Sequence, residues 1–458
     1  MEFVSHNPAT EEIEAEFPNA DPGMIESALS QASAAQTAWR DLPVEIRAEF
    51  LRQVAARLRA RAPELADLAA REMGKPLREG LAEVEKCAWG CTYTADHAQD
   101  YFGPTPVSSD ATRSYVRYEP LGAILAVMPW NFPYWQIFRF GAAALLAGNV
   151  IVLKHAPTVP RCALALESVV AEASRSLGLP AEPLRNLFAP VSAIETVVAH
   201  PAIAAVTLTG SERAGRSLAA VAGRQLKKAV LELGGSDPFI VLADADLEST
   251  VGWAVRARVQ NNGQSCIAAK RFLVEASIAD RFVEQFRAAL ARLTVGDPLD
   301  PATDIGPLAR ADLRDLLARQ VEVTIQEGAR CLLGGTVPNR RGYYYPPTLL
   351  DRAQPGMTAM DEETFGPVAV VCRVDNPDHA VAVANQSRYG LGASIWSRDT
   401  ARAEGLASRL EAGNVFINGM VKSDPRLPFG GTKCSGYGRE LSVQGAREFV
   451  NAKTVWVG

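Results

Sequence analysis

Residues 122–157 read GAILAVMPWNFPYWQIFRFGAAALLAGNVIVLKHAP, and this stretch decides the fold class. Runs rich in valine, isoleucine and leucine stand at its two ends, and a longer apolar segment separates them. This order predicts a strand, a helix and a second strand. Similar strand-like runs follow at AAVTLTG (204–210), KAVLELGG (228–235) and PFIVL (238–242). Because parallel strands need long crossover connections, the alternation predicts an α/β fold with a parallel sheet covered on both faces.

The residues before and after this stretch fall into further regions. The first hundred residues look helical: one helix should open with Asp21 as its cap and Pro22 at its first position, and another should close on Gly74. The α/β alternation resumes after Cys266, which indicates a second parallel-sheet unit. Two further strand-like segments, 111–120 and 449–458, lie outside both units.

Composition excludes several classes of function. The chain has 458 residues with a net charge of −5, and its basic residues are scattered, so neither a nucleic-acid footprint nor a membrane-binding stripe is indicated. The first ten residues lack the features of a signal peptide. The longest apolar run, 140–153, is shorter than the roughly 20 residues that a membrane span needs. We expect a soluble cytoplasmic protein with no nucleic-acid or membrane partner.

The cysteines argue against a disulfide scaffold and against a metal site. There are seven, an odd number, and they are spread along the chain. Cys87, Cys91 and His97 come nearest to a metal cluster, but no second pair completes a tetrahedral site. Buried thiols on a helix are the simpler interpretation, and we expect no metal.

The segment VQNNGQSCIAAKR, residues 259–271, surrounds one thiol, Cys266, with polar side chains. A nucleophilic thiol needs a positive potential or hydrogen-bond donors nearby. None of the five histidines has the sequence surroundings of a cysteine-hydrolase partner. A nucleophilic cysteine without a histidine, in a chain that also has a candidate catalytic glutamate and a candidate phosphate-binding helix, indicates thioester chemistry with a cofactor.

Three other polar residues have both a functional and a structural interpretation. Glu232 stands on an otherwise apolar strand before two glycines, where it is either a working carboxylate or half of a salt bridge. Asn131, between prolines, is either an oxyanion donor or a turn asparagine. Arg139 lies in an aromatic helix, where a buried guanidinium needs a carboxylate.

In the motif TGSERAG a strand ends at Gly210 and a helix starts near Ser211. The helix N-terminus suits a phosphate, but a plain strand-to-helix turn has the same pattern.

Seven motifs together resemble the NAD(P)-dependent aldehyde dehydrogenase superfamily. In chain order they are PWNFP, LKHAP, TGSERAG, LELGG, NNGQSC, EETFGPV and PFGGTKCSGYGRE, and they span nearly the whole sequence. The resemblance implies that Cys266 is the catalytic nucleophile, that Asn131 helps to hold the oxyanion, and that Glu232 activates water as the general base.

The resemblance also implies the domain organisation: two Rossmann-like units with parallel sheets and an arm of β-strands. Residues 1–104 and 121–232 would form the cofactor-binding domain and residues 233–444 the catalytic domain. Residues 105–120 and 445–458 would form the arm that joins subunits into a homodimer or homotetramer.

The cofactor implied by the resemblance is NAD+ or NADP+. The residues that would bind it are Trp130, Lys154, His155, Pro157, Gly210, Ser211, Glu363 and Phe365. A glutamate at the position of Pro157 would bond the ribose hydroxyl and repel a 2′-phosphate. Pro157 does neither, so the sequence leaves the choice between NAD+ and NADP+ open.

Within the superfamily the chain is most similar to the bacterial succinate-semialdehyde dehydrogenase branch. Arg139 matches an arginine that holds the substrate carboxylate in those enzymes. A second arginine, six residues before the nucleophile, is replaced here by Gln260, and Arg426 could substitute for it. The expected reaction is therefore oxidation of succinic semialdehyde to succinate. Other aliphatic or ω-carboxy aldehydes, a broad substrate range, and a cysteine hydrolase or thioesterase are the alternatives.

Overall fold

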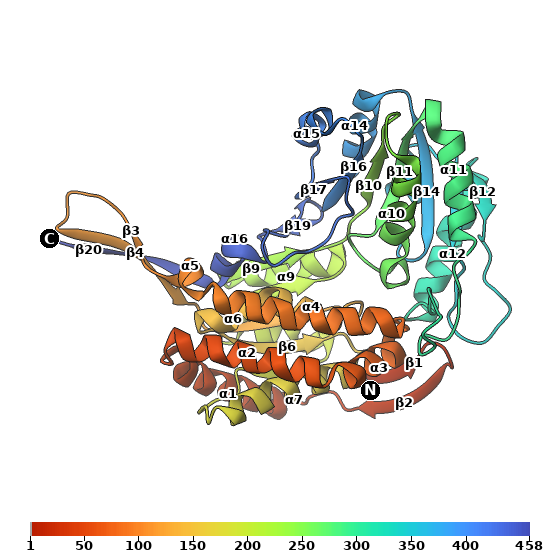
Figure 1. Cartoon of the computed structure of the whole chain (residues 1–458). Coiled ribbons are helices and arrows are strands. Elements are labelled where there is room, and N and C mark those ends of the chain that lie inside the picture. Colours follow the sequence, from red (N-terminus) through yellow and green to blue (C-terminus); the bar gives the residue numbers. More distant parts are fainter. Residues whose placement is uncertain (1) are drawn as a thin grey trace.

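The computed structural model describes residues 2–458, which form two α/β units and a projecting arm (Figure 1). The first unit is built on a six-stranded sheet. Its strands, in spatial order, are β19 (Gly436–Tyr437), β9 (Lys228–Glu232), β8 (Ile203–Thr209), β5 (Ala123–Met128), β6 (Val150–His155) and β7 (Leu184–Asn186). All neighbouring strands are parallel except β19 and β9. The predicted parallel sheet is confirmed.

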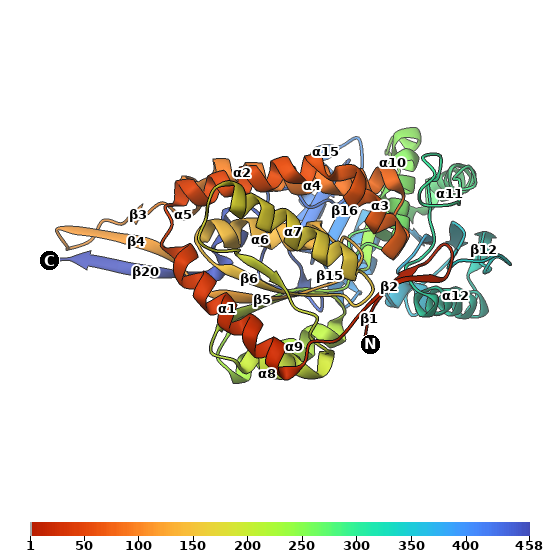
Figure 2. The same cartoon turned by 90° about the horizontal axis from the view of Figure 1, so that it is seen from below.

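Helices cover both faces of this sheet, as Figure 2 shows. On one face lie α1 (Pro22–Arg40), α8 (Ile194–Ala199) and α9 (Glu212–Arg224). On the other lie α6 (Trp135–Ala147) and α7 (Pro160–Ser176), backed by α2 (Val44–Ala60), α3 (Ala62–Met73), α4 (Leu77–Asp96) and α5 (Ala98–Phe102). Because both faces are covered, β6 is buried along its whole length and is apolar until its last two residues.

The second unit has a seven-stranded sheet. Its spatial order is β12 (Arg330–Leu333), β13 (Thr348–Asp351), β14 (Val368–Val374), β11 (Ala269–Glu275), β10 (Asp237–Val241), β16 (Gly392–Trp396) and β17 (Asn414–Ile417). Only β12 runs antiparallel to its neighbour. One face is covered by α10 (Leu247–Val259) and α11 (Ala276–Leu290), and the other by α12 (Ala311–Gln326), α14 (Pro377–Asn385) and α15 (Thr400–Ala407). Helix α13 (Thr358–Asp361) follows β13.

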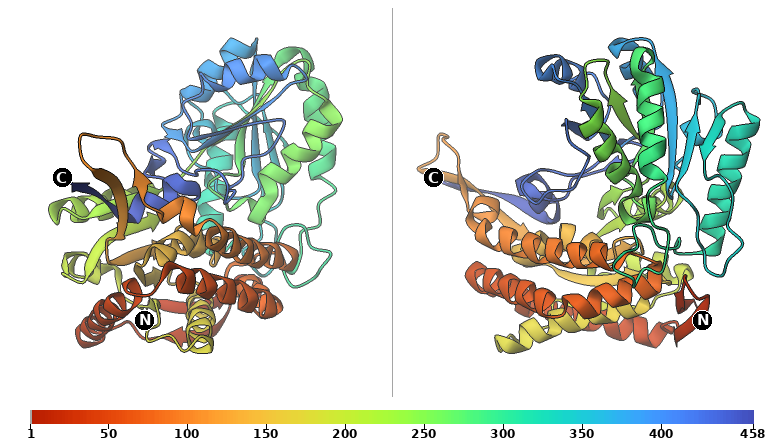
Figure 3. Two further views of the ribbon diagram at one scale, coloured as in Figure 1. Left: turned by 60° about the vertical axis from the view of Figure 1, so that its left-hand side comes forward. Right: turned by 45° about the vertical axis from the view of Figure 1, so that its right-hand side comes forward.

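The two strand-like segments expected outside the units pair with each other. Strand β4 (Arg113–Pro120) lies antiparallel between β20 (Val450–Val457) and the short β3 (Thr105–Pro106). This small sheet projects from the body with the C-terminus at its end (Figures 1 and 3). Trp456 near that end is 54% exposed. No helix within residues 2–458 is long and apolar enough to cross a lipid bilayer.

Two predicted helix ends are confirmed. The side chain of Asp21 accepts a hydrogen bond from the Met24 backbone N–H at 2.8 Å, with Pro22 at the first helical position. Helix α3 ends at Gly74 with a left-handed φ of 77°. A Cβ there would lie 2.4 Å from the carbonyl oxygen of Pro307, so glycine also permits a close approach to the second unit.

The first hundred residues are not all helical. A hairpin of β1 (Phe3–Asn7) and β2 (Glu12–Phe17) precedes α1. The backbone N–H of Val4 donates to the carbonyl of Pro157 at 3.0 Å, and that of Tyr343 donates to Pro8 at 2.9 Å. The hairpin was missed although β2, EIEAEF, alternates charged and apolar residues as a strand does; β2 is mostly exposed, and the helix that follows it was the stronger signal.

The end of the chain returns from the second unit to the first. After a two-strand ladder of β15 (Tyr389–Gly390) and β18 (Thr432–Lys433), β19 pairs with β9, and α16 (Ser442–Ala446) contacts α6. The expected boundary at residue 444 assigns this segment to the second unit, whereas its hydrogen bonds join it to the first. The return brings Glu440 beside α6, which matters for the site.

Candidate active site

The site residues gather where the carboxyl ends of the first sheet meet the second unit. Strands β5, β6 and β9 end at Met128, His155 and Glu232, and the motifs follow or include these ends. In parallel α/β sheets, ligands bind outside the carboxyl ends of the strands. The loop that carries Cys266 enters from the second unit, between α10 and β11.

The polar side chains before Cys266 determine the path of this loop. Asn261, Asn262 and Gly263 have φ values of 54°, 57° and 72°, three left-handed residues in succession. Asparagine and glycine are the residues that adopt this region at least cost. A Cβ at Gly263 would stand 2.4 Å from the backbone of Gly366, so this position also needs glycine for close packing.

Side-chain hydrogen bonds fix the loop to both units. Asn262 Nδ2 donates to the carbonyls of Gly74 (2.7 Å) and Pro307 (3.0 Å), and its Oδ1 accepts from the Gly306 N–H (2.8 Å). Gln264 Oε1 accepts from the Ala309 N–H at 2.9 Å. The polar residues around Cys266 therefore shape the turn that presents the thiol, as the sequence indicated.

Lys270, which the sequence analysis did not single out, holds the other side of the loop. Its Nζ donates to the carbonyls of Ser265 (3.0 Å), Cys266 (2.8 Å) and Ala268 (3.1 Å), and lies 3.8 Å from Glu363 Oε1. Three carbonyls on one buried ammonium form a rigid turn. Its only sequence signal is a lysine beside Arg271 at the start of β11, before the apolar run of that strand.

Asn131 is attached to the Cys266 loop. Its Nδ2 donates to the carbonyl of Gln264 at 3.1 Å, and its own carbonyl accepts from Asn261 Nδ2 at 2.7 Å. The thiol of Cys266 is partly exposed. Burial raises the pKa of Cys266 to about 12, against the opposing charges of Arg139 and Lys270. The thiol is therefore protonated at neutral pH and must lose its proton when it attacks.

Glu232 ends β9 and is buried, with 2% of its surface exposed. Burial raises its pKa to about 8; the charge of Arg139 opposes the shift, and Glu440 adds to it. A Cβ at Gly430 would stand 3.0 Å from Glu232 Oε1, so glycine lets the backbone approach the carboxyl. A carboxyl with this pKa is mostly protonated at neutral pH, and its charged form, which can accept a proton, increases as the pH rises through about 8.

Arg139 lies in this site, where its guanidinium is paired with acids of the chain. Its Nε is paired with the buried carboxylate of Glu440, and its Nη2 lies 3.1 Å from Thr209 Oγ1 and 4.0 Å from Glu232 Oε2. The guanidinium also lies over the ring of Phe429, 4.7 Å from its centroid. Glu440 thus pairs with one edge of the guanidinium, and binding of the substrate carboxylate by Arg139 stays a prediction. Glu440, within the quoted GRE motif, was not singled out.

Arg426 is exposed and also paired. It forms two hydrogen bonds with Asp424, at 2.8 and 2.7 Å, and lies 5.6 Å from the ring centroid of Trp89. Its side chain is 60% exposed, so solvent screens the pair. The expectation that Arg426 replaces the missing second arginine has no support from this geometry.

The residues expected to bind a cofactor lie along the same edge. Lys154 ends in a buried position 5.6 Å from the ring of Phe3, and burial lowers its pKa. His155 Nε2 donates to the carbonyl of Pro133 at 2.9 Å, and burial lowers the pKa of His155 to about 4. Neutral His155 thus joins the end of β6 to the PWNFP turn. Pro157 is half-buried, and its carbonyl accepts from Val4.

The start of α9 and two further motifs complete this edge. Ser211 caps α9 by accepting from the Ala214 N–H at 3.3 Å, and Gly210 stands just before it. Glu363 Oε1 accepts from the Gly235 N–H at 3.0 Å. The rings of Trp130 and Phe365 meet edge to face at 5.8 Å.

This donor set fits a dinucleotide. It contains a basic side chain at Lys154, a helix N-terminus at Ser211 for phosphate, and a carboxylate at Glu363 for a ribose. A Cβ at Gly234 would lie 2.5 Å from Glu363 Oε2, so glycine keeps space beside that carboxylate. Among residues 2–458, no group of three or more histidine, cysteine, aspartate or glutamate residues is arranged to hold a metal ion.

The sequence profile described as "Aldehyde dehydrogenase family" matches residues 1–455. The chain belongs to the aldehyde dehydrogenase family. It is 49% identical over 457 residues to a probable succinate-semialdehyde dehydrogenase (NADP+) of Synechocystis, covering all of both chains. It is 48% identical over 453 residues to a succinate semialdehyde dehydrogenase (NAD(P)+) of Escherichia coli, with 99% of this chain and 97% of that protein aligned.

Solved structures of the family superimpose closely on this chain. One is succinic semialdehyde dehydrogenase from Streptococcus pyogenes with NADP+, with a TM-score of 0.96, 38% identity and 99% of each chain covered. Another, Gox0499, has a TM-score of 0.97 and 40% identity over 100% of this chain and 99% of that one. The aldehyde dehydrogenase fold expected from the motifs is confirmed.

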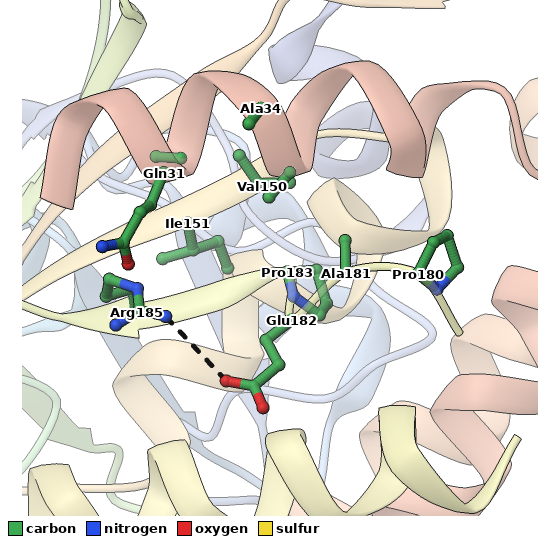
Figure 4. Close-up of a pocket in the computed structure, with 11 residues that line it drawn as sticks. Gln31, Ala34, Val150, Ile151, Pro180, Ala181, Glu182, Pro183 and Arg185 are labelled. Carbon is green, nitrogen blue, oxygen red and sulfur yellow. Dashed lines mark ion pairs between the residues drawn. The ribbon is translucent and has the colours of Figure 1, made fainter. Parts of the chain in front are cut away.

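A surface pocket of about 290 Å³ lies away from this site (Figure 4). It lies between α1 and the starts of β6 and β7, at the opposite edge of the first sheet, and its lining includes Gln31, Val150 and Arg185. An ion pair of Arg185 and Glu182, 4.0 Å long, crosses its rim. Nothing in it resembles the chemistry of the site around Cys266.

Proposed function

We propose that this protein oxidises succinic semialdehyde to succinate, with NADP+ or NAD+ as the hydride acceptor. The names of its relatives support the substrate, since the similarity extends over the whole chain. One observation supports the chemistry most strongly: a partly exposed thiol, Cys266, accompanies a buried glutamate, Glu232, whose pKa is about 8. These are the nucleophile and the base that a two-step oxidation through a thioester requires.

In the first step Cys266 Sγ attacks the aldehyde carbon and loses its proton, which gives a hemithioacetal. The oxygen of the former carbonyl gains charge, and Asn131 Nδ2 with the Cys266 backbone N–H would donate hydrogen bonds to it. Asn131 is suited to this because the Cys266 loop already fixes its position. Collapse of the hemithioacetal expels a hydride and leaves a thioester on Cys266.

A nicotinamide bound at the site supplies the acceptor for that hydride. Lys154 would hold the adenosine ribose, the N–H groups that begin α9 after Gly210 would face the pyrophosphate, and Glu363 would hold the other ribose. Trp130 and Phe365 would pack beside the nicotinamide ring. His155 would act indirectly, by fixing the end of β6 against the turn that carries Asn131.

In the second step Glu232 takes a proton from water, and the resulting hydroxide attacks the thioester carbon. The carbon–sulfur bond breaks, succinate leaves, and Cys266 regains a proton. Arg139 and Glu440 would position Glu232 and set its charge. This hydrolysis distinguishes the proposal from transfer of the acyl group to a thiol such as coenzyme A.

We also propose that NADP+ is accepted. Pro157 carries no charge, so it would not repel a 2′-phosphate as a carboxylate would. Lys154, buried nearby at the end of β6, adds positive potential. Several of the curated relatives carry NADP+ in their names.

The proposal also assigns a role to each part of the fold. Residues 1–104 and 121–232, which carry five of the six strands of the first sheet, would bind the cofactor, and residues 233–444 would supply the nucleophile. The arm, residues 105–120 and 445–458, would join subunits into a dimer or tetramer in the cytoplasm. The return of β19 to the first sheet means that residues 436–440 would serve the cofactor-binding unit.

Ultraviolet absorbance of the reduced nicotinamide tests the proposal. Wild-type protein with NADP+ and succinic semialdehyde should form reduced cofactor and an equal amount of succinate, and omission of either reactant should abolish the signal. Butanal, which lacks the carboxylate, should be a poorer substrate. If no reduced cofactor forms but the protein hydrolyses a thioester in the absence of nicotinamide, it is a cysteine hydrolase and the proposal is rejected.

A further inference from the structure

Two carboxylates on α4 reach the two segments that carry the reacting groups. Glu79 and Glu83 are four residues apart, so their side chains lie on the same side of the helix, one turn from each other. Glu79 accepts a hydrogen bond from the backbone N–H of Asn261, where the turn before Cys266 begins. Helix α4 packs against α6 (Figure 1), and there Glu83 meets the start of α6.

Glu83 binds the backbone just after the PWNFP turn. Its Oε1 accepts from the N–H groups of Tyr134 and Trp135, each at 2.9 Å. Its other carboxylate oxygen pairs with Lys75, whose ammonium also lies 4.2 Å from the ring centroid of Phe132 within the turn. Both members of the pair are buried, so solvent screens them little. A charged group of α4 therefore fixes the end of this turn.

These contacts close a ring of hydrogen bonds around the groups that would hold the oxyanion. Asn131 Nδ2 donates to the carbonyl of Gln264, and Asn261 Nδ2 donates to the carbonyl of Asn131. The PWNFP turn and the Cys266 loop thus contact each other directly, and each is also attached to the same turn of α4. Because the ring is closed, neither segment can shift relative to the other without breaking one of these bonds.

A need for stability alone does not explain the buried pair. Replacing a buried ion pair by apolar residues is often neutral or stabilising, because the two charges must lose their water. A helix N-terminus is ordinarily capped by a short polar side chain of its own segment. In the described chain the N-cap residue of α6, Tyr134, makes no side-chain capping bond, and Glu83 from another helix takes that part. The pair fixes the start of α6 against α4.

We propose that Glu79 and Glu83 position the two donors to the oxyanion. Glu83, with Lys75, sets the place of Asn131 Nδ2, and Glu79 sets that of the Cys266 backbone N–H. Both carboxylates act through these donors and touch neither substrate nor cofactor. The inference rests on the proposed function, because it concerns the oxyanion that forms when a thiol attacks an aldehyde.

Two double variants separate the hydrogen bonds of Glu83 from its charge. Lys75→Met/Glu83→Gln removes both charges but keeps a carbonyl oxygen for the two N–H groups, whereas Lys75→Met/Glu83→Leu also removes that acceptor. We expect kcat to fall about a hundredfold in the leucine variant and less than about threefold in the glutamine variant, because misplacing a reacting group by about 1 Å has an effect of that size. KM for the aldehyde and the Kd of NADP+ should change little.

Glu85→Leu is the matched control on α4. The Glu85 side chain is 58% exposed and pairs with Arg59 at the surface, so its loss should leave kcat and KM at their wild-type values. Circular dichroism and cofactor binding show whether each double variant is folded.

A double-mutant cycle with Asn131→Ala distinguishes positioning from general support of the fold. If Glu83 acts through Asn131, the leucine variant should lose about a hundredfold when the Asn131 amide is present and little more when it is already absent. A structural loss would instead multiply with the loss from Asn131→Ala. The rate at which reduced cofactor forms in a single turnover measures this, since it reports the formation and collapse of the hemithioacetal.

Glu79 provides a test that does not depend on the buried pair. Its side chain is partly exposed, so Glu79→Ala should fold even where the double variants do not. We expect kcat to fall roughly tenfold, the effect of one hydrogen bond to a charged group, and Glu79→Gln to recover most of that loss.

The two failures can be told apart. Wild-type protein that forms no reduced cofactor from any aldehyde would contradict the proposed function. Active wild-type protein whose folded leucine variant keeps the wild-type kcat would overturn this inference alone, and Glu79→Ala decides in the same way if the leucine variant does not fold. Losses that multiply with the loss from Asn131→Ala, or that appear in KM or cofactor binding rather than in kcat, would also overturn it.

Discussion

At the scale of single residues, the buried carboxyl of Glu232 sets how the reaction depends on pH. It must be charged to take a proton from water, and its pKa is about 8. Raising the pH through that value increases the charged fraction, so kcat should rise between neutral pH and about pH 9 and then level off. A pH profile of kcat with saturating substrates measures this.

The control for the pH profile is Glu232→Gln, which should lose the rising limb together with most of the steady-state turnover. A wild-type kcat that is constant across the same range would contradict the role of Glu232, provided that hydrolysis of the thioester limits the rate.

Arg139 is expected to act on stability and on the pH profile through its pairs with Glu232 and Glu440. Arg139→Leu leaves the buried carboxyls of Glu232 and Glu440 without their shared cation, and breaking one buried pair typically costs about 3–5 kcal/mol of unfolding free energy. Loss of the positive charge also raises the pKa of Glu232 further, so the rise in kcat should move to higher pH. Denaturant unfolding and the pH profile measure the two effects.

Arg139→Lys keeps the charge and should recover part of both losses. Arg398→Leu is a surface control, because the Arg398 side chain is 73% exposed and its pair with Asp246 should contribute less than about 1 kcal/mol. Unchanged stability and an unchanged pH profile in Arg139→Leu, with KM raised for succinic semialdehyde alone, would restore the substrate-clamp interpretation.

At the scale of elements, the loop before Cys266 is held rigid by side-chain hydrogen bonds and contains three successive residues with a left-handed backbone. Asn262→Gly removes the side-chain bonds to Gly74, Pro307 and Gly306 but keeps an easy left-handed φ. Asn262→Ala removes the same bonds and adds a strained backbone, so it should be less stable than Asn262→Gly by about 1–2 kcal/mol. Both variants should lower kcat, since the loop presents the thiol.

Denaturant unfolding of the two variants, with kcat measured alongside, checks the prediction. Equal stabilities for the alanine and glycine variants would show that the left-handed backbone at this position stores no strain, and an unchanged kcat in both would show that the loop does not position Cys266.

Elements governed by local rules could be predicted from the sequence. The strands of the first sheet follow from their apolar runs, and the ends of α1 and α3 follow from Asp21, Pro22 and Gly74. The hairpin β1–β2 was missed although β2 alternates charged and apolar residues. Its position could not be predicted, because contacts to distant segments hold it in place.

The site residues also divide into those that neighbouring sequence predicts and those that depend on distant segments. Cys266 and its turn were predictable, because the residues that shape the loop are its neighbours in sequence. The partner of Arg139 was not, because Glu440 is 301 positions away and reaches it only when β19 returns to the first sheet.

At the scale of the whole molecule, the arm carries an exposed apolar side chain that no other part of the described chain covers. Strand β20 pairs with β4 over eight residues, and near its end Trp456 remains 54% exposed. We expect truncation after Phe449 to convert a dimer or tetramer into smaller species in analytical ultracentrifugation, because β4 then loses its partner and the arm its outer strand. Trp456→Ser should weaken association less. Wild-type protein that sediments as a monomer would contradict this role of the arm.

The measurement that tests the central claim most directly is mass spectrometry of Glu232→Gln after incubation with succinic semialdehyde and NADP+. Without the base, the thioester should form and persist. The account predicts that the peptide containing Cys266 gains the mass of one succinyl group, that one reduced cofactor forms per site, and that neither occurs in Cys266→Ala. Complete absence of the adduct in folded Glu232→Gln that binds cofactor, or an adduct on another cysteine, would contradict it.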